Sequence, residues 1–87
     1  MAVMPKAPSY EQTVETLVGL YDAERDAQVK ASILRALGES HQKSALRKLM
    51  DVARRDASLD LRKMAIRQIG ESKDPEALKF LEELLKQ

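Results

Sequence analysis

Few side chains in this sequence are of the types that carry out catalysis or bind metal ions. His41 is the only histidine and cysteine is absent, so the chain offers no thiolate nucleophile, no disulfide and no cysteine-based zinc site. The acids Glu82 and Glu83, and Glu71 with Asp74, have the spacing of helix-surface or capping residues, not of an acid–base pair in a cleft. No phosphate-binding loop or dinucleotide fingerprint occurs. We therefore expect no catalytic residue, no metal and no cofactor, and a protein that is not an enzyme.

The charge balance argues against nucleic acid as the partner. Lys and Arg number 15 and Asp and Glu number 14, which gives a net charge of +1, whereas nucleic-acid-binding domains are usually strongly basic. Only Tyr10, Tyr21 and Phe80 provide rings that stack on bases. No apolar run approaches the roughly 20 residues of a membrane helix, and the first residues lack the apolar stretch of a signal peptide. A cytoplasmic protein that does not enter the membrane is the default expectation.

Strong helix formers fill the chain of 87 residues, and no alternating strand pattern interrupts them. Helix starts are predicted at Ser9, which forms a capping box with Gln12, and after the caps Asp26 and Ser58. A further start is predicted at Asp74, which precedes a proline at the first helical position. The third helix has a weaker start, because glutamine is a poor cap. The predicted helices cover about 10–23, 27–38, 42–55, 59–70 and 74–87.

An internal repeat of 32 residues organises these helices. Residues 27–55 laid over residues 59–87 give seven identities, including the Gly-Glu-Ser triplets that begin at Gly38 and Gly70. Both glycines are predicted to end a helix in the left-handed conformation. A further shift of 32 residues aligns the first helix with the third. The sequence therefore contains about two and a half copies of one helix pair.

Every predicted helix carries an apolar arc that must face a core. The arcs comprise Val14, Leu17, Val18, Leu20 and Tyr21; Val29, Ile33, Ala36 and Leu37; Ala45, Leu46, Leu49, Met50, Val52 and Ala53; Leu61, Ala65, Ile66 and Ile69; and Ala77, Leu78, Leu81, Leu84 and Leu85. The first, third and fifth helices alternate in net charge, and neighbours of opposite charge favour stacking in register.

The second copy resembles the bacterial HEAT-like repeat, a family that includes the PBS-lyase HEAT-like repeats. The family pattern has an apolar-Arg pair, an Ala, an apolar-Gly turn and then Asp-Pro-x-Ala-Leu, and the stretch 60–78 follows it. The first copy departs from the pattern at Lys30, at Ile33 and over residues 42–44. The resemblance implies an all-α fold, a short right-handed α-solenoid of five helices. We expect this repeat domain to cover residues 9–87 and a flexible N-terminal arm to cover residues 1–8.

HEAT-like repeats use acid–base pairs as a ladder between stacked repeats. Lys30 and Arg62 each project among apolar neighbours on their helices, where a cation needs a partner or a path to water. Glu24 and Asp56 each lie six residues upstream, at the turn that enters the same helix. We therefore expect two structural pairs, Glu24–Lys30 and Asp56–Arg62, which we name the ladder.

The same resemblance places the second and fourth helices on the concave side of the solenoid. Their outward positions include Arg35, Lys63 and Arg67, which we name the basic ridge. A ridge of this kind holds an acidic peptide or a phosphate, unless acids on the same helices pair with it and leave only a solvated face.

The function that follows is a protein–protein interaction module or a segment of a larger scaffold, with another protein or a peptide as partner. The first alternative is binding of a nucleic-acid backbone through the basic ridge, as in some HEAT-like DNA-repair proteins. The second alternative is an accessory subunit of an enzyme, as in HEAT-like proteins tied to bilin attachment to phycobiliproteins.

The fifth helix has an apolar flank that no later helix of this chain covers. Phe80 and Leu84 extend its apolar arc toward this flank, whereas terminal repeats usually carry a polar outer face. A longer array, another molecule or the N-terminal arm would cover the flank. For the isolated chain we expect a weak homodimer through the C-terminal helix, with Phe80 and Leu84 in the contact.

Overall fold

The computed structural model describes residues 10–86, and its regular structure there is entirely helical. The helices are α1 (Tyr10–Ala23), α2 (Ala27–Ser40), α3 (Lys43–Arg55), α4 (Leu59–Glu71) and α5 (Pro75–Leu85). The predicted all-α class is confirmed. The predicted arm over residues 1–8 and the predicted cap at Ser9 lie outside the described residues.

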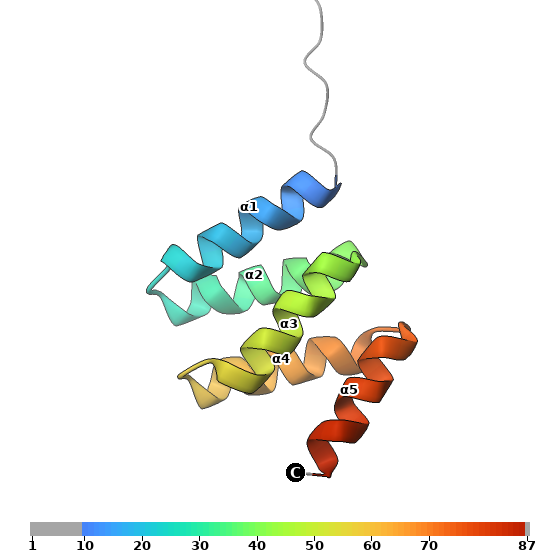
Figure 1. Cartoon of the computed structure of the whole chain (residues 1–87). Helices are drawn as coiled ribbons and strands as arrows, with labels where there is room; N and C mark the ends of the chain where they lie inside the picture. The colour runs from blue at the N-terminus through green and yellow to red at the C-terminus, as the bar shows by residue number, and fades with distance from the viewer. Residues whose placement is uncertain (1–9, 87) are drawn as a thin grey trace, which may run out of the picture.

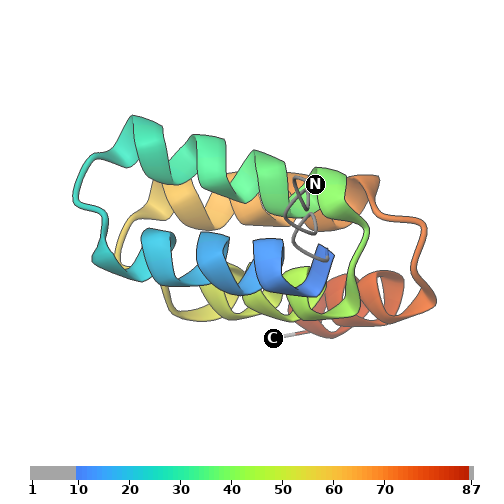
Figure 2. The same cartoon turned by 90° about the horizontal axis from the view of Figure 1, so that it is seen from above.

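The helices are arranged in two layers. Figure 1 shows them following one another along the molecule, and Figure 2 shows α2 and α4 in one layer and α1, α3 and α5 in the other. Within this arrangement α2 packs on α3 and α4 on α5, while α4 also contacts α2 and α3 of the preceding pair. Helix α1 packs on α2 and α3, as the second helix of a preceding pair would. The fold is therefore a short α-solenoid of helix pairs.

The helix starts follow the predicted caps. The Asp26 carboxylate accepts hydrogen bonds from the backbone N–H groups of Gln28 and Val29, and the Ser58 hydroxyl accepts one from Leu61. Asp74 caps α5 in the same way. The side chain of Gln42 makes no capping hydrogen bond at the start of α3, as its residue type predicts.

The predicted glycine ends are wrong. Helix α2 continues past Gly38 to Ser40, and the left-handed residue beyond it is His41, with φ 55°. Helix α4 continues past Gly70 to Glu71. Gly38 has a packing role instead, because a Cβ at this position would collide with the side chain of Gln68 on α4. The glycine therefore allows α2 and α4 to approach closely.

The core lies between the two layers and is built from the inward arcs of all five helices. Its most completely buried large side chains are Val14, Leu34, Leu37 and Ile69. The arc of α3 is buried or half-buried throughout, as predicted. Several other arc residues are exposed, contrary to prediction: Leu20, Val29, Ile66, Leu78 and Leu85. A helical period identifies an apolar arc but not which of its edges meets a neighbouring helix.

The exposed positions at the C-terminal end match positions that are buried one repeat earlier. Leu46 on α3 is 5% exposed, whereas its repeat equivalent Leu78 on α5 is 62% exposed. Leu34 and Ile66 differ in the same sense, and so do Ala53 and Leu85. The first copy buries these side chains against the second copy, and no helix of the described chain follows α5.

Candidate functional site

The basic ridge lies on the layer formed by α2 and α4. Arg35, Lys63 and Arg67 are all exposed, as predicted from their outward positions. Lys63 and Arg67 lie one helical turn apart and line a shallow pocket of about 180 Å³ together with Asp60 and Met64. Arg35 is not part of this pocket. The structure therefore brings two of the three predicted residues into one concavity.

The three cations of the basic ridge make no ion pair with any residue that the structure describes. The opposite layer differs, because Lys43, Lys48 and Arg55 of α3 pair with Asp74, Asp22 and Asp51, respectively. Asp60 also makes no ion pair with a described residue, although it lies in the pocket with Lys63 and Arg67. Self-pairing of the ridge is therefore not seen between the described residues.

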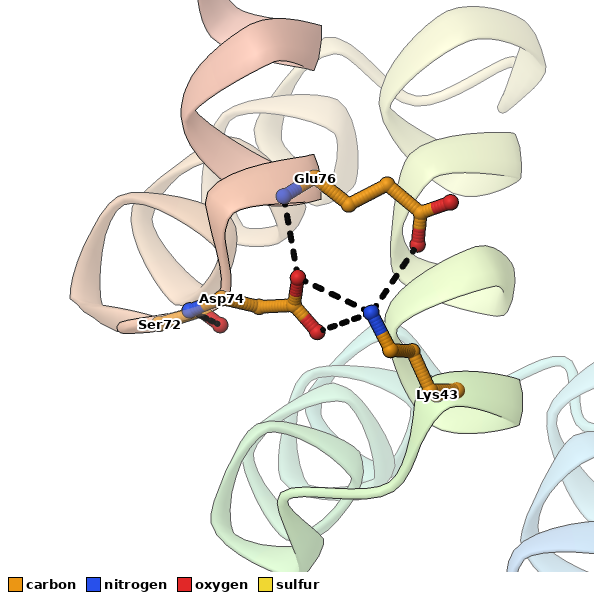
Figure 3. A network of polar contacts seen from close by, with 4 residues as sticks. All are labelled: Lys43, Ser72, Asp74 and Glu76. Atoms are coloured by element: carbon orange, nitrogen blue, oxygen red, sulfur yellow. Dashed lines mark hydrogen bonds and ion pairs between the residues drawn. The ribbon is translucent and has the colours of Figure 1, made fainter.

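Lys43 connects the start of α3 to the start of α5. Its Nζ lies 2.8 Å from Asp74 Oδ2, 3.1 Å from Asp74 Oδ1 and 3.8 Å from Glu76 Oε2 (Figure 3). Asp74 Oδ1 also accepts the backbone N–H of Glu76 at 2.9 Å, and Ser72 Oγ accepts that of Asp74 at 3.2 Å. The hydrogen bond with Lys43 holds the pKa of Asp74 below its usual value, and the same bond raises the pKa of Lys43. This network ties the equivalent turns of the two copies together.

The predicted ladder does not form as ion pairs. Glu24 Oε1 instead accepts the backbone N–H groups of Arg25 and Asp26, at 2.9 and 3.0 Å. Those donors lie within two residues of Glu24, so they satisfy its carboxylate at little cost in chain order. Among the described residues Glu24 makes no ion pair with Lys30, nor Asp56 with Arg62.

Tyr21 takes the place that the ladder was expected to fill. Its hydroxyl donates to both carboxylate oxygens of Asp56, at 3.2 and 3.3 Å. The ammonium groups of Lys30 and Lys48 lie 4.7 and 5.2 Å from the centre of its ring. Sequence reasoning missed this cluster. The available signal was a tyrosine at a core position, because a buried hydroxyl needs a hydrogen-bond partner.

Burial and the nearby Asp56 carboxylate both raise the pKa of Tyr21, burial being the larger effect. The phenol therefore stays protonated at neutral pH and donates to Asp56. Arg62, the other cation of the expected ladder, has a buried Nε without a hydrogen-bond partner among the described residues. The two copies thus differ: Lys30 of the first copy has an aromatic partner, whereas Arg62 of the second copy makes no ion pair within residues 10–86.

The predicted apolar flank of α5 is placed on the wrong side of the helix. Phe80 is only 4% exposed, and the guanidinium carbon of Arg54 lies 4.7 Å from the centre of its ring. Leu84 is half-buried and packs against the core. Ala77, Phe80 and Leu84 thus lie on the side of α5 that faces the core. Leu78 and Leu85 form the exposed edge instead.

The residues considered for catalysis lie on the surface. His41 is exposed at the end of α2, and Glu71, Glu82 and Glu83 are exposed on α4 and α5. Within residues 10–86 no three His, Cys, Asp or Glu side chains are grouped as metal ligands would be. Over the same residues, no helix combines the length and the apolar character needed to cross a membrane.

Comparison with known families agrees with the repeat and with the stacked helix pairs. The sequence matches the family described as HEAT repeats over residues 11–87. The chain belongs to the HEAT-repeat family. HEAT repeats generally serve as scaffolds for protein interaction and are typically not enzymes. No curated protein and no solved structure matches the chain.

Proposed function

We propose that this HEAT-repeat protein is a non-enzymatic interaction module, or a segment of a larger scaffold, that binds an acidic surface of a protein or peptide through the basic ridge. The observation that carries this proposal is the pocket lined by Lys63 and Arg67, whose charged groups have no ion-pair partner among the described residues. Two cations one turn apart receive a carboxylate without first breaking an internal pair.

The two aromatic rings whose burial the structure describes favour a protein partner over a nucleic acid. Tyr21 and Phe80 are both buried, at 4% exposure each, so neither offers a face on which a base stacks. Neither ring lines the pocket of Lys63 and Arg67. Met64, which does line it, gives that pocket an adaptable apolar wall of the kind found at protein-binding surfaces.

Charge reversal at one ridge position tests the proposal. With a fluorescent oligo-glutamate peptide as probe, Arg67→Glu is expected to weaken binding by about tenfold or more, while circular dichroism shows an unchanged fold because Arg67 is exposed. Arg47→Glu is the matched control, since Arg47 is an exposed cation of the opposite layer. Equal binding of the peptide by wild type and Arg67→Glu contradicts binding through the basic ridge. Stronger binding of a single-stranded oligonucleotide, falling steeply with salt, supports the nucleic-acid alternative instead.

A further inference from the structure

A second concavity lies between the turns that join α2 to α3 and α4 to α5. It has a volume of about 260 Å³, below the roughly 300–1,000 Å³ of sites that enclose drug-sized molecules. Leu37, Leu46 and Leu49 give it an apolar floor, and Gln68, His41 and Lys73 are among its polar residues. None of the basic-ridge residues lines it, so it is a separate site.

Gln68 is the residue that marks this cavity as a binding site. It is the one buried polar residue of the described chain, with an exposed fraction of 8%, and it lines the cavity. Its carboxamide makes no hydrogen bond with any described residue, and its nitrogen and oxygen are not among the fully buried unpaired atoms, so they stay accessible from the cavity. Gly38 leaves room for the amide, because a Cβ at this position would meet the end of the Gln68 side chain. The amide thus presents its NH₂ donor group and its C=O acceptor to the cavity.

The neighbouring rim groups differ in their freedom to bind. The Asp74 carboxylate is already engaged by Lys43 and by a backbone N–H (Figure 3). Lys73 is exposed and makes no ion pair with the described residues. His41 stands at the rim, where it is the left-handed residue that ends α2. The free groups are therefore an amide, an imidazole and an ammonium above a leucine floor.

We propose that this cavity binds a single apolar residue of an extended partner peptide, and that this peptide carries a carboxylate beside that residue. The side chain of that residue covers the leucine floor. The Gln68 carboxamide pairs with the N–H and the C=O that an extended residue presents on one edge, and Lys73 faces the carboxylate. This site goes beyond the proposed function of the basic ridge, and the two involve different sides of α4: Arg67 is exposed and Gln68 is buried.

N-acetyl-leucine is a suitable probe, because it contains the apolar side chain, the amide and the carboxylate. Titrated into the ¹⁵N-labelled chain, it is expected to shift the side-chain amide resonance of Gln68 and to saturate in the millimolar range. N-acetyl-leucinamide, which lacks the carboxylate, and N-acetyl-alanine, which lacks the large side chain, are expected to bind several-fold more weakly. Equal affinity for all three compounds, or no saturable shift with N-acetyl-leucine, overturns the proposal.

Gln68→Met separates a binding role from a structural one, since methionine has a similar length and no amide. We expect this variant to lose at least about tenfold in affinity for N-acetyl-leucine and to unfold at a temperature no lower than that of wild type, because the removed amide makes no hydrogen bond with a described residue. Gln28→Met is the matched control at an exposed position of α2 and leaves both quantities unchanged. Lys73→Gln reduces the affinity for N-acetyl-leucine to that for N-acetyl-leucinamide. If Gln68→Met binds N-acetyl-leucine as tightly as wild type does, the proposed site is overturned, whatever the result for Arg67→Glu.

Discussion

At the scale of single residues, the acids at the turns accept hydrogen bonds from nearby donors other than the cations expected from the sequence. Glu24 lies next to the unpaired backbone N–H groups at its own turn and binds those, whereas Asp56 meets the hydroxyl of Tyr21 from α1. Sequence spacing identified both acids as structural but paired them with the wrong groups. The reason is geometric, because spacing along one helix does not contain the position of a side chain from another helix.

Replacing Tyr21 by phenylalanine tests the hydrogen bond to Asp56. Near pH 7 we expect Tyr21→Phe to lower the free energy of unfolding by about 0.5–1.5 kcal/mol, the usual net contribution of one such bond. Urea denaturation of both chains measures this difference. Asp56→Ala is expected to cost about as much, because it leaves the buried phenol without its acceptor. An unchanged midpoint in both variants would show that the hydroxyl is satisfied by water instead.

The same pair gives the wild-type protein a dependence on alkaline pH. The pKa of Tyr21 is raised in the folded state above its ordinary value of 10.0, so the unfolded chain releases the proton at lower pH than the folded chain does. The stabilising contribution is therefore fully present below about pH 10 and is lost as the pH rises toward the folded pKa. Tyr21→Phe lacks this particular loss, so the stabilities of the two chains converge in alkaline urea titrations. If the free energies of unfolding of the two chains instead change with pH in parallel, the alkaline pH dependence does not come from Tyr21.

At the scale of helices, the starts were predictable and the ends were not. A helix start depends on one side chain and the next few N–H groups, and Asp26, Ser58 and Asp74 act as their residue types predict. The helix ends depended on side chains from neighbouring helices. Gly38 is required by the side chain of Gln68 on another helix, and that requirement is invisible in the local sequence. The left-handed position falls at His41 instead.

Alanine at the two equivalent glycines separates these roles. Gly70 has open space around it and lies within α4, so Gly70→Ala is expected to stabilise the protein by about 0.5–1 kcal/mol through helix propensity. At Gly38 the new methyl group collides with Gln68, and overpacking of this kind costs about 1–3 kcal/mol. Thermal or urea unfolding should therefore rank Gly70→Ala above wild type and wild type above Gly38→Ala. The reverse order would mean that Gln68 moves aside freely.

At the scale of the whole molecule, the internal repeat is the feature from which the fold could be predicted. The spacing of 32 residues, the apolar arcs and the caps together specify stacked helix pairs, because every helix must bury its arc against a neighbour. Which residues face the open end of the array depends on the rotation of the last helix. Leu78 occupies the position that the next helix pair covers in the first copy, so it is exposed on α5, while Phe80 is buried. The Gln68 cavity was missed, because its walls come from three helices and two turns.

The exposed edge of α5 moves the expected homodimer contact from Phe80 and Leu84 to Leu78 and Leu85. One patch serves both subunits of a two-fold dimer, and full burial of a leucine contributes roughly 1.5–3 kcal/mol. After the cost of association, that patch supports only weak pairing, so we expect light scattering to show self-association toward the upper end of a hundredfold concentration range. Leu78→Glu should abolish it, while Leu20→Glu, at an exposed leucine on α1, should not. If the wild-type chain stays monomeric over the whole concentration range, the homodimer prediction is contradicted and another partner would have to cover this edge.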